Sequence, residues 1–377
     1  MQIEQMNWAP DTGWTPPNLG QLGDKAQLVF LFGSRAVLRQ SERLADVRRA
    51  YPQALLFGCS TAGEIVDTQV RDDTLVVTAV SFEHTTVLGA AVPIATPSDS
   101  FAAGQLLAQA FDPHGLAHVL VLSDGLHING SALVQGLTQH LPPHVSVTGG
   151  LAGDGARFAE TVVVWNGEAT SGTIAAVGLY GDRLRVGYGS LGGWDSFGPD
   201  RLITRSIGNV LYELDGTSAL TLYKRYLGEH AANLPASGLL FPLSLSTGVG
   251  AERVVRTILA VNETDQSITF AGDVPEGAAA RLMKANFDRL IDGAIGAATA
   301  STLTGAPAEL ALLISCVGRK LVLQQRIEEE VEGVREVLGA QAALTGFYSY
   351  GEISPLQTTA RCALHNQTMT ITTFAEI

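Results

Sequence analysis

The chain has 377 residues, of which 46% are hydrophobic and 16% charged, and its formal net charge is −13. This composition excludes a disordered chain, because there is enough apolar surface to bury well-packed sheets. The acidic balance argues against binding to nucleic acid or to anionic membranes, which needs clustered lysine and arginine. The length favours two domains over one small core.

No apolar run approaches the roughly 18 residues that a membrane span needs. The first residues, which contain Pro10, Pro16 and Pro17, lack the basic and apolar regions of a signal peptide. We therefore expect a cytoplasmic protein without a membrane partner.

A first strand-helix-strand pattern follows about 25 residues without periodicity. An apolar run at 28–32 leads through a loop to a helical pattern at 41–50, and a second apolar run at 55–57 comes next. The pattern ends in Phe57-Gly58-Cys59-Ser60-Thr61-Ala62-Gly63-Glu64-Ile65. Short apolar runs that alternate with amphipathic helices indicate crossover units in a largely parallel sheet.

A strand at 74–82 and a helix at 101–111 are expected before a second, looser copy of the pattern. This copy runs from an apolar strand at 119–122 through Ser123-Asp124-Gly125 and a helix at 131–140 to Gly149-Gly150-Leu151-Ala152-Gly153-Asp154. Its glycine loop is one residue shorter and carries Asp in place of Glu.

The region after the second copy has a different pattern. Alternating β-branched residues and Asn-Gly or Gly-Asp turns predict an antiparallel meander over 161–188, followed by a glycine-rich loop at 189–198. A helix at 218–227 marks the expected domain boundary, and a hairpin at 254–270 and a helix at 278–300 lie beyond it. The expected division is an arm at 1–25, a first domain at 26–217 and a second domain at 218–377.

A third copy begins with the apolar strand 310–314 and continues through a helical stretch at 321–338. It ends in Thr345-Gly346-Phe347-Tyr348-Ser349-Tyr350-Gly351-Glu352-Ile353, which repeats the spacing of the first glycine loop. Residues 361–374 then alternate with the period of a strand. The sequence therefore predicts two α/β domains built on repeated strand-helix-strand units with mixed sheets.

The three glycine loops each place an acid at the carboxyl end of a strand, where sheets of this class bind ligands. Glycine there permits positive φ or close approach of the backbone to a ligand. Glu64, Asp154 and Glu352 could hold a cationic group of a ligand or satisfy loop amides, and both readings stay open.

Further candidates for ligand contact lie in neighbouring loops. Arg35 and Arg319 occupy corresponding first loops and could clamp the carboxylate of an amino acid or another small anion, or could be exposed cations near helix starts. Cys59 and Cys316 lie at strand ends, where they could contact a ligand or be buried small hydrophobes. The predicted ligand-binding residues are Arg35, Cys59, Ser60, Thr61, Glu64, Asp124, Asp154, Trp194, Cys316, Arg319, Tyr348, Tyr350 and Glu352.

Both halves of the chain resemble the FIST (F-box and intracellular signal transduction) family. The resemblance lies in Gly58 to Ile65, Asp124-Gly125, Asn129-Gly130, Gly149 to Gly155, Gly192-Gly193-Trp194, Ser315 to Arg319, Tyr348 to Ile353 and His365 to Thr368. It implies a sensory module that binds a small ligand and signals to a separate partner such as a histidine kinase, a chemoreceptor or a cyclic-diguanylate enzyme. Some family members are haem-containing nitric oxide sensors, so the resemblance makes haem an alternative.

Haem iron needs a nitrogen or sulfur ligand facing an apolar pocket. His127 and His365 are the predicted axial ligands, with Cys59 and Cys316 as thiolate candidates. No Cys-x-x-Cys-His motif occurs, so any haem would be non-covalent.

Two other classes remain as alternatives. A hydrolase would use Ser60, which lacks a Gly-x-Ser-x-Gly elbow although Asp124 and His365 could complete a triad in space. A purely structural scaffold would bind no ligand at all.

Overall fold

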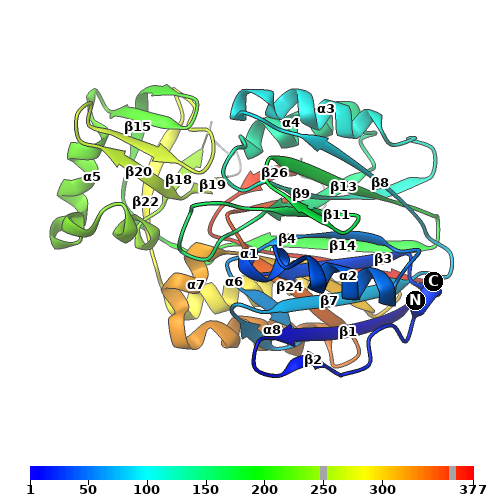
Figure 1. Ribbon diagram of the computed structural model, residues 1–377. Coiled ribbons are helices and arrows are strands. Elements are labelled where there is room, and N and C mark those ends of the chain that lie inside the picture. The colour runs from blue at the N-terminus through cyan, green and yellow to red at the C-terminus, as the bar shows by residue number, and fades with distance from the viewer. Residues whose placement is uncertain (247–252, 356–361) are drawn as a thin grey trace.

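The computed structural model describes residues 1–246, 253–355 and 362–377. Three mixed sheets form the larger part of the fold, and a smaller inserted body, residues 195–284, lies beside them (Figure 1). Each mixed sheet holds one parallel pair of strands, β3 with β4, β9 with β10 or β23 with β24. The α/β fold with mixed sheets is therefore confirmed.

The three strand-helix-strand copies of the sequence become three structural units. The first unit contains β1 (Gln2–Ala9), β2 (Gly13–Thr15), β3 (Leu28–Gly33), α1 (Arg35–Leu38), α2 (Ser41–Ala50), β4 (Leu55–Ser60), β5 (Glu64–Val66), β6 (Gln69–Arg71) and β7 (Leu75–Ser81). The second contains β8 (Thr86–Pro93), α3 (Ser100–Gln109), β9 (Leu116–Ser123), α4 (Gly130–His140), β10 (Ser146–Leu151), β11 (Val163–Trp165), β12 (Glu168–Thr170) and β13 (Thr173–Tyr180). The third contains β14 (Leu184–Leu191), α6 (Phe287–Ala300), β23 (Leu310–Cys316), α7 (Val317–Leu323), α8 (Ile327–Leu338), β24 (Ala343–Ser349), β25 (Gly351–Pro355), β26 (Cys362–His365) and β27 (Met369–Glu376).

The inserted body interrupts the third unit between β14 and α6 and carries an antiparallel sheet of its own. Its elements are β15 (Asp195–Ile207), β16 (Val210–Leu214), β17 (Thr217–Ser218), α5 (Ala219–Leu227), the 3-10 helices η3 (Gly228–Asn233) and η4 (Ala236–Leu240), β18 (Leu243–Ser246), β19 (Val254–Arg256), β20 (Ile258–Asn262), β21 (Ser267–Phe270) and β22 (Ala279–Lys284).

In each unit, the hairpin that follows the glycine loop pairs with the sheet of another unit. The β5–β6 hairpin of the first unit pairs with β24 of the third, and the β11–β12 hairpin of the second pairs with β4 of the first. The β25–β26 hairpin of the third unit pairs with β10 of the second and closes the cycle. The three sheets are therefore interlocked. The first sheet has the order β11–β12 hairpin, β4, β3, β7 and β1, and the equivalent strands of the other two sheets follow the same order.

The first glycine of each loop is required by the close approach of a neighbouring strand. A Cβ at that position would lie 1.8 or 1.9 Å from a carbonyl oxygen of the parallel partner strand, which leaves no room for a side chain. The facing residues are Gly58 with Leu31, Gly149 with Val121, and Gly346 with Leu313.

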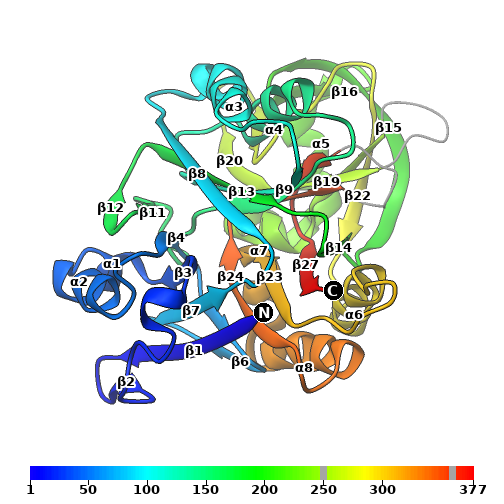
Figure 2. The same cartoon turned by 90° about the vertical axis from the view of Figure 1, so that its right-hand side faces the viewer.

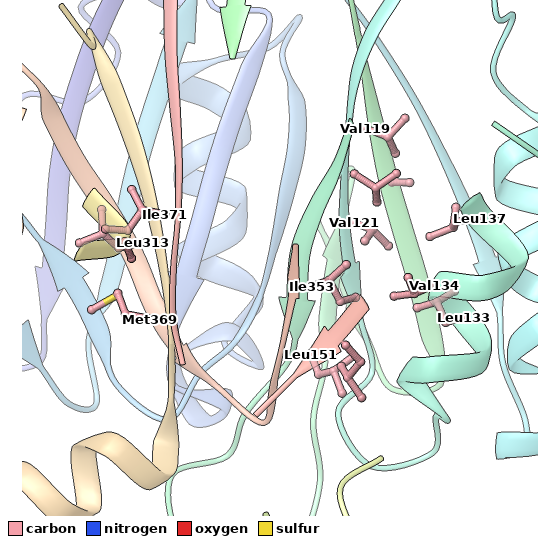
Figure 3. Packing of buried hydrophobic residues seen from close by; sticks show 14 of the residues in the cluster. Val119, Val121, Leu133, Val134, Leu137, Leu151, Leu313, Ile353, Met369 and Ile371 are labelled. Carbon is pink, nitrogen blue, oxygen red and sulfur yellow. The ribbon is translucent and has the colours of Figure 1, made fainter. Parts of the chain in front are cut away.

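The core lies between the sheets and between each sheet and its helices. Figure 2 shows α2, α3 with α4, and α6 with α8 at three places around the outside of the sheets. In the second unit, side chains of β9 such as Val121 face Leu133 and Leu137 of α4 (Figure 3). Between the first and third sheets, the rings of Phe32 and Phe347 stack at a centroid distance of 4.8 Å. Among the described residues, no helix is long and apolar enough to cross a membrane.

Several elements differ from the sequence prediction. Residues 1–25, expected as an arm, contain β1 and β2, because β1 pairs along its length with β7 and buries Met6. The expected helix at 278–300 begins only at Phe287, since residues 279–284 form β22. The expected helix at 321–338 is divided, because α7 ends at Leu323 and α8 begins at Ile327.

Two further predictions concern the ends of elements. The expected strand at 361–374 is divided at Gln367, where a φ of +64° turns the chain between β26 and β27, and Arg361 lies outside the described residues. The domain boundary after residue 217 stays a prediction. β17 spans this boundary and pairs with β16, with Glu213 opposite Ser218.

Candidate functional site

The three glycine loops meet where the three units join, and we call this place the junction. Backbone hydrogen bonds link the loops in a closed ring, with equivalent donors and acceptors from each unit. The bonds run from Ala62 N to Tyr348 O (2.7 Å), from Gly153 N to Ser60 O (2.8 Å) and from Tyr350 N to Leu151 O (3.2 Å). The repeated loops therefore hold the units together by their backbones.

Glu64 is buried at the junction and is satisfied by its own unit. Its carboxylate accepts hydrogen bonds from the Thr61 hydroxyl and from Thr74, through the amide at 3.1 Å and the hydroxyl at 2.7 Å. Burial raises the pKa of Glu64 to about 7, although these hydrogen bonds act in the opposite direction. The bond to Thr74 fixes the start of β7.

Glu352 repeats this arrangement in the third unit. Its carboxylate accepts hydrogen bonds from the Ser349 hydroxyl at 2.7 Å and from the Thr368 amide and hydroxyl at 3.2 and 3.0 Å. Burial raises the pKa of Glu352 to about 8. Both glutamates thus tie a glycine loop to the strand that follows its hairpin, which is the loop-fixing alternative of the two sequence readings.

Asp154, the acid of the second loop, has charged partners instead. Arg157 Nε donates to its carboxylate at 2.9 Å, and Arg35 Nε lies 3.3 Å from the same oxygen. Arg35 also donates to Glu160 at 2.6 Å, and this bond is the largest cause that lowers the pKa of Glu160 to about 2. The cation expected to clamp a ligand carboxylate therefore faces two carboxylates of the protein.

Arg319 is fully buried and forms an ion pair with Glu330 at 2.7 Å. Its guanidinium also donates to the carbonyl oxygens of Leu290, at 2.6 Å, and of Gly192. Glu330 accepts a further hydrogen bond from the Tyr348 hydroxyl at 2.7 Å. Arg319 and Tyr348, both predicted to contact a ligand, thus share one internal partner.

Trp194 and the cysteines are also internal. The Trp194 indole donates to the carbonyl oxygen of Gln367 at 2.9 Å and packs where the inserted body joins the third unit. Cys59 and Cys316 are buried, and burial raises the pKa of both thiols. Neither thiol is exposed to a ligand in solution.

The residues proposed for a hydrolytic triad have other partners. Ser60 Oγ accepts from the Val162 amide at 2.9 Å, and Asp124 accepts from amides of its own loop. His365 Nε2 lies 2.8 Å from the carbonyl oxygen of Ser354. The fold thus satisfies each group separately and does not bring the three together as a triad.

A cleft of about 780 Å³ lies between the second unit and the inserted body. One wall comes from the loops after β9 and β10 and from Tyr350, and the other comes from η3, η4, β20 and the segment after β21. Of the predicted site residues, only Tyr350 lines it. The lining is Pro97, Gly125, Leu126, Ile128, Asn129, Leu151, Ala156, Phe158, Asn209, Asn233, Leu234, Pro235, Leu239, Ile258, Leu259, Phe270, Ala271, Gly272, Leu321 and Tyr350.

Two stacked aromatic rings lie on the wall opposite the inserted body, one from the second unit and one from the third. Phe158 and Tyr350 lie with ring centroids 4.4 Å apart and an angle of 13° between their planes. The Tyr350 hydroxyl accepts from the Phe158 amide at 3.2 Å and donates to Gly155 O at 3.1 Å. Phe158 has a φ of +49°, which is uncommon for a bulky residue.

The sequence reasoning missed Phe158 and all of the cleft wall that the inserted body provides. The only local signal was an aromatic residue in the polar loop after Gly155, because no periodic pattern marks residues that converge from separate loops. For Asn129, the sequence offers only the Asn129-Gly130 motif of the family resemblance.

The cleft does not fit haem. His365 is 1% exposed and bonded to Ser354 O, and burial lowers its pKa to about 4, while His127 lies beside Asp124 with 55% of its side chain exposed. Neither histidine lines the cleft. The Tyr350 hydroxyl, an oxygen that could ligate iron, is held by two backbone bonds.

The chain matches two family models, the FIST N domain over residues 27–217 and the FIST C domain over residues 219–355. No curated protein matches it. Among solved structures, the crystal structure of a cyanuric acid hydrolase from A. caulinodans is similar at 9% sequence identity and a TM-score of 0.38, with 100% of this chain and 98% of that chain covered. The two domain models together span most of the sequence, and the chain therefore belongs to the FIST family of sensing domains in signal transduction.

Proposed function

We propose that this protein is a small-molecule sensor whose ligand binds in the cleft between the second unit and the inserted body. The observation that carries the proposal is the cleft itself, which has a volume of about 780 Å³ and walls from two parts of the fold. Small-molecule sites typically occupy about 300–1,000 Å³ and favour such interfaces. The junction is a poorer candidate, because its acids Glu64, Asp154 and Glu352 are buried and accept hydrogen bonds within the protein.

Binding in the cleft offers a way to transmit a signal. A ligand that contacts both walls favours one position of the inserted body over others. This body joins the third unit beside Gly192 and Trp194, which are held by Arg319 and by the Gln367 carbonyl. A change in the position of the inserted body would therefore shift the segment that leads into α6.

We further propose that a separate protein receives the signal. The family resemblance favours a histidine kinase, a chemoreceptor or a cyclic-diguanylate enzyme as this partner. We also propose that the sensor works in the cytoplasm.

A thermal-shift screen of small metabolites tests the proposal. A compound that binds the folded chain raises its melting temperature, and the rise grows with the logarithm of the ligand concentration above the dissociation constant. Ala156 is exposed and lines the cleft, so the large side chain of Ala156→Trp should obstruct the cleft beside Phe158 and abolish the shift. Ala159→Trp is the matched control, because Ala159 is exposed in the same loop but does not line the cleft. A shift that survives Ala156→Trp would place the ligand elsewhere.

A further inference from the structure

We infer that the cleft takes an uncharged, planar aromatic molecule that stacks on the ring of Phe158. This inference rests on the proposed function, since it specifies the ligand of the same cleft. Four features of the described lining carry it, namely its charge, the two stacked rings, the strained backbone of Phe158 and the side-chain amide of Asn209 at its edge.

The lining of the cleft contains no acidic or basic side chain among the described residues. The charged groups beside the lining have internal partners. Asp273 accepts from Asn129 Nδ2 at 2.9 Å, the buried Arg256 donates to Leu364 O at 3.0 Å, and Arg157 pairs with Asp154 at 2.9 Å. An ion that entered the cleft would lose its water without gaining a counter-ion, which is costly. A neutral ligand avoids this cost, whereas the amino acid or small anion expected from the sequence does not.

The ring pair supplies a flat surface. One face of Phe158 lies on Tyr350, and the side chain nevertheless remains exposed, with 39% of the residue accessible. Tyr350 is fixed by its two hydrogen bonds, so the pair has a defined orientation. Offset stacking is a preferred geometry of aromatic groups, and a planar ligand could extend this stack by one ring.

The backbone of Phe158 provides an independent reason. Bulky residues rarely adopt positive φ, and such strain is concentrated at ligand-binding sites. Here the strained residue is also one of the exposed large hydrophobic side chains of the protein. Burial of the Phe158 side chain within the fold therefore does not offset the energy cost of its strained backbone, whereas contact with a ligand would.

The opposite wall and the edge complete the description. The inserted body contributes Leu259, which is 43% exposed, and Pro235 as apolar surface for the ligand. Asn209 Nδ2 donates to Phe270 O at 2.7 Å, and the Oδ1 of the same amide can act as an acceptor. A ring N–H or hydroxyl on the ligand would match this acceptor.

Two fluorescent probes with the same ring system separate charge from shape. N-Phenyl-1-naphthylamine is neutral, and 1-anilinonaphthalene-8-sulfonate carries one negative charge. We expect the neutral probe to bind saturably to the full chain and the anionic probe to bind at least tenfold more weakly. Equal affinity for the two probes would overturn the inference of an uncharged ligand.

Variants of Phe158 test the stacking contact. Phe158→Ala should weaken binding of N-phenyl-1-naphthylamine about tenfold, whereas Phe158→Tyr, which keeps the ring, should bind within about twofold of the parent chain. Leu88→Ala is the matched control, since Leu88 is 50% exposed on β8 and does not line the cleft. Circular dichroism and melting temperature establish that each variant is folded.

The outcomes also separate this inference from the proposed function. Loss of probe binding in both Phe158→Ala and Ala156→Trp supports both. If Phe158→Ala binds the neutral probe normally while Ala156→Trp does not, the cleft is the site but the stacking inference is wrong. If the neutral probe binds to Ala156→Trp as it does to the parent chain, the inference fails. The proposed function fails separately if the metabolite shift also survives in Ala156→Trp.

Discussion

The junction and the cleft differ in almost every physical property. At the junction, Glu64 and Glu352 are buried among hydroxyl and amide donors of their own units. In the cleft, the walls are largely apolar, and Phe158 remains exposed. The two glutamates of the junction are therefore paired within the protein, whereas the ring of Phe158 in the cleft is left partly uncovered.

This difference shows what repetition in a sequence indicates. The glycine loops recur because three equivalent sheets need the same close strand contact and the same ring of backbone bonds. Most of the cleft lining lies in the inserted body and in the loop around Phe158, which have no counterparts in the other units, although Leu151 and Tyr350 belong to the glycine loops. Repeated motifs here mark shared structure, and the unrepeated residues are better candidates for binding.

The largest expected effect is the loss of folding in Gly346→Ala. The added Cβ would lie 1.8 Å from the carbonyl oxygen of Leu313, and neither strand can move without breaking the sheet. We expect a loss of more than about 4 kcal/mol of unfolding free energy, or no soluble folded protein. Urea unfolding followed by circular dichroism measures it.

Gly296→Ala is the control for this substitution. A Cβ there would meet only the end of the Leu191 side chain, which is 43% exposed and can move. A Gly346→Ala protein as stable as Gly296→Ala would show that the close approach at the junction is not required.

The second effect is the removal of a buried cation. Arg319→Ala would leave Glu330 buried without its ion pair, which typically costs about 3–5 kcal/mol. The matched control is Arg205→Ala, because Arg205 pairs with Glu213 at 2.9 Å and about half of its side chain is exposed. That pair should contribute less than about 1 kcal/mol. Equal losses in the two variants would contradict the structural role of Arg319.

The third effect is a dependence of stability on pH. The folded-state pKa of Glu352 is raised from 4.5 to about 8, so the folded chain binds more protons than the unfolded chain between these values. Its contribution is fully present below about pH 4.5 and is lost as the pH rises toward 8. Glu64 acts in the same direction, up to a pH of about 7.

Glu352→Gln should flatten this dependence. The amide stays neutral, can accept from Thr368 and can donate to the Ser349 hydroxyl, so the junction is kept. Between pH 5 and pH 8, the unfolding free energy of the parent chain should fall by on the order of 3 kcal/mol more than that of the variant. Urea unfolding at each pH measures this difference. Equal slopes in the two chains would show that Glu352 is ionised throughout this range in the folded chain.

The smallest expected effect belongs to the cleft. Phe158→Ala should change the unfolding free energy by less than about 1 kcal/mol, because the side chain is 39% exposed and its backbone is strained. Thermal unfolding without ligand measures this value. A loss above about 2 kcal/mol would mean that Phe158 is a core residue and would remove the contrast between the two regions.

The sequence alone determined the three strand-helix-strand units. Buried strands such as 28–33 and 310–316 have continuous apolar runs, and the intervening helices have amphipathic patterns, so both are visible in local sequence. The glycine loops at the strand ends were equally visible, because Gly58 and Gly346 meet a steric need that only glycine satisfies.

The tertiary structure alone decided what those loops contact and where a ligand fits. The hairpin exchange pairs Glu64 with Phe347 across nearly the whole chain, and no periodicity in either segment specifies that partner. The cleft brings Phe158 together with Leu259, which come from different bodies. Local periodicity fixes which face of an element is buried, but a binding surface depends on how distant elements pack against each other.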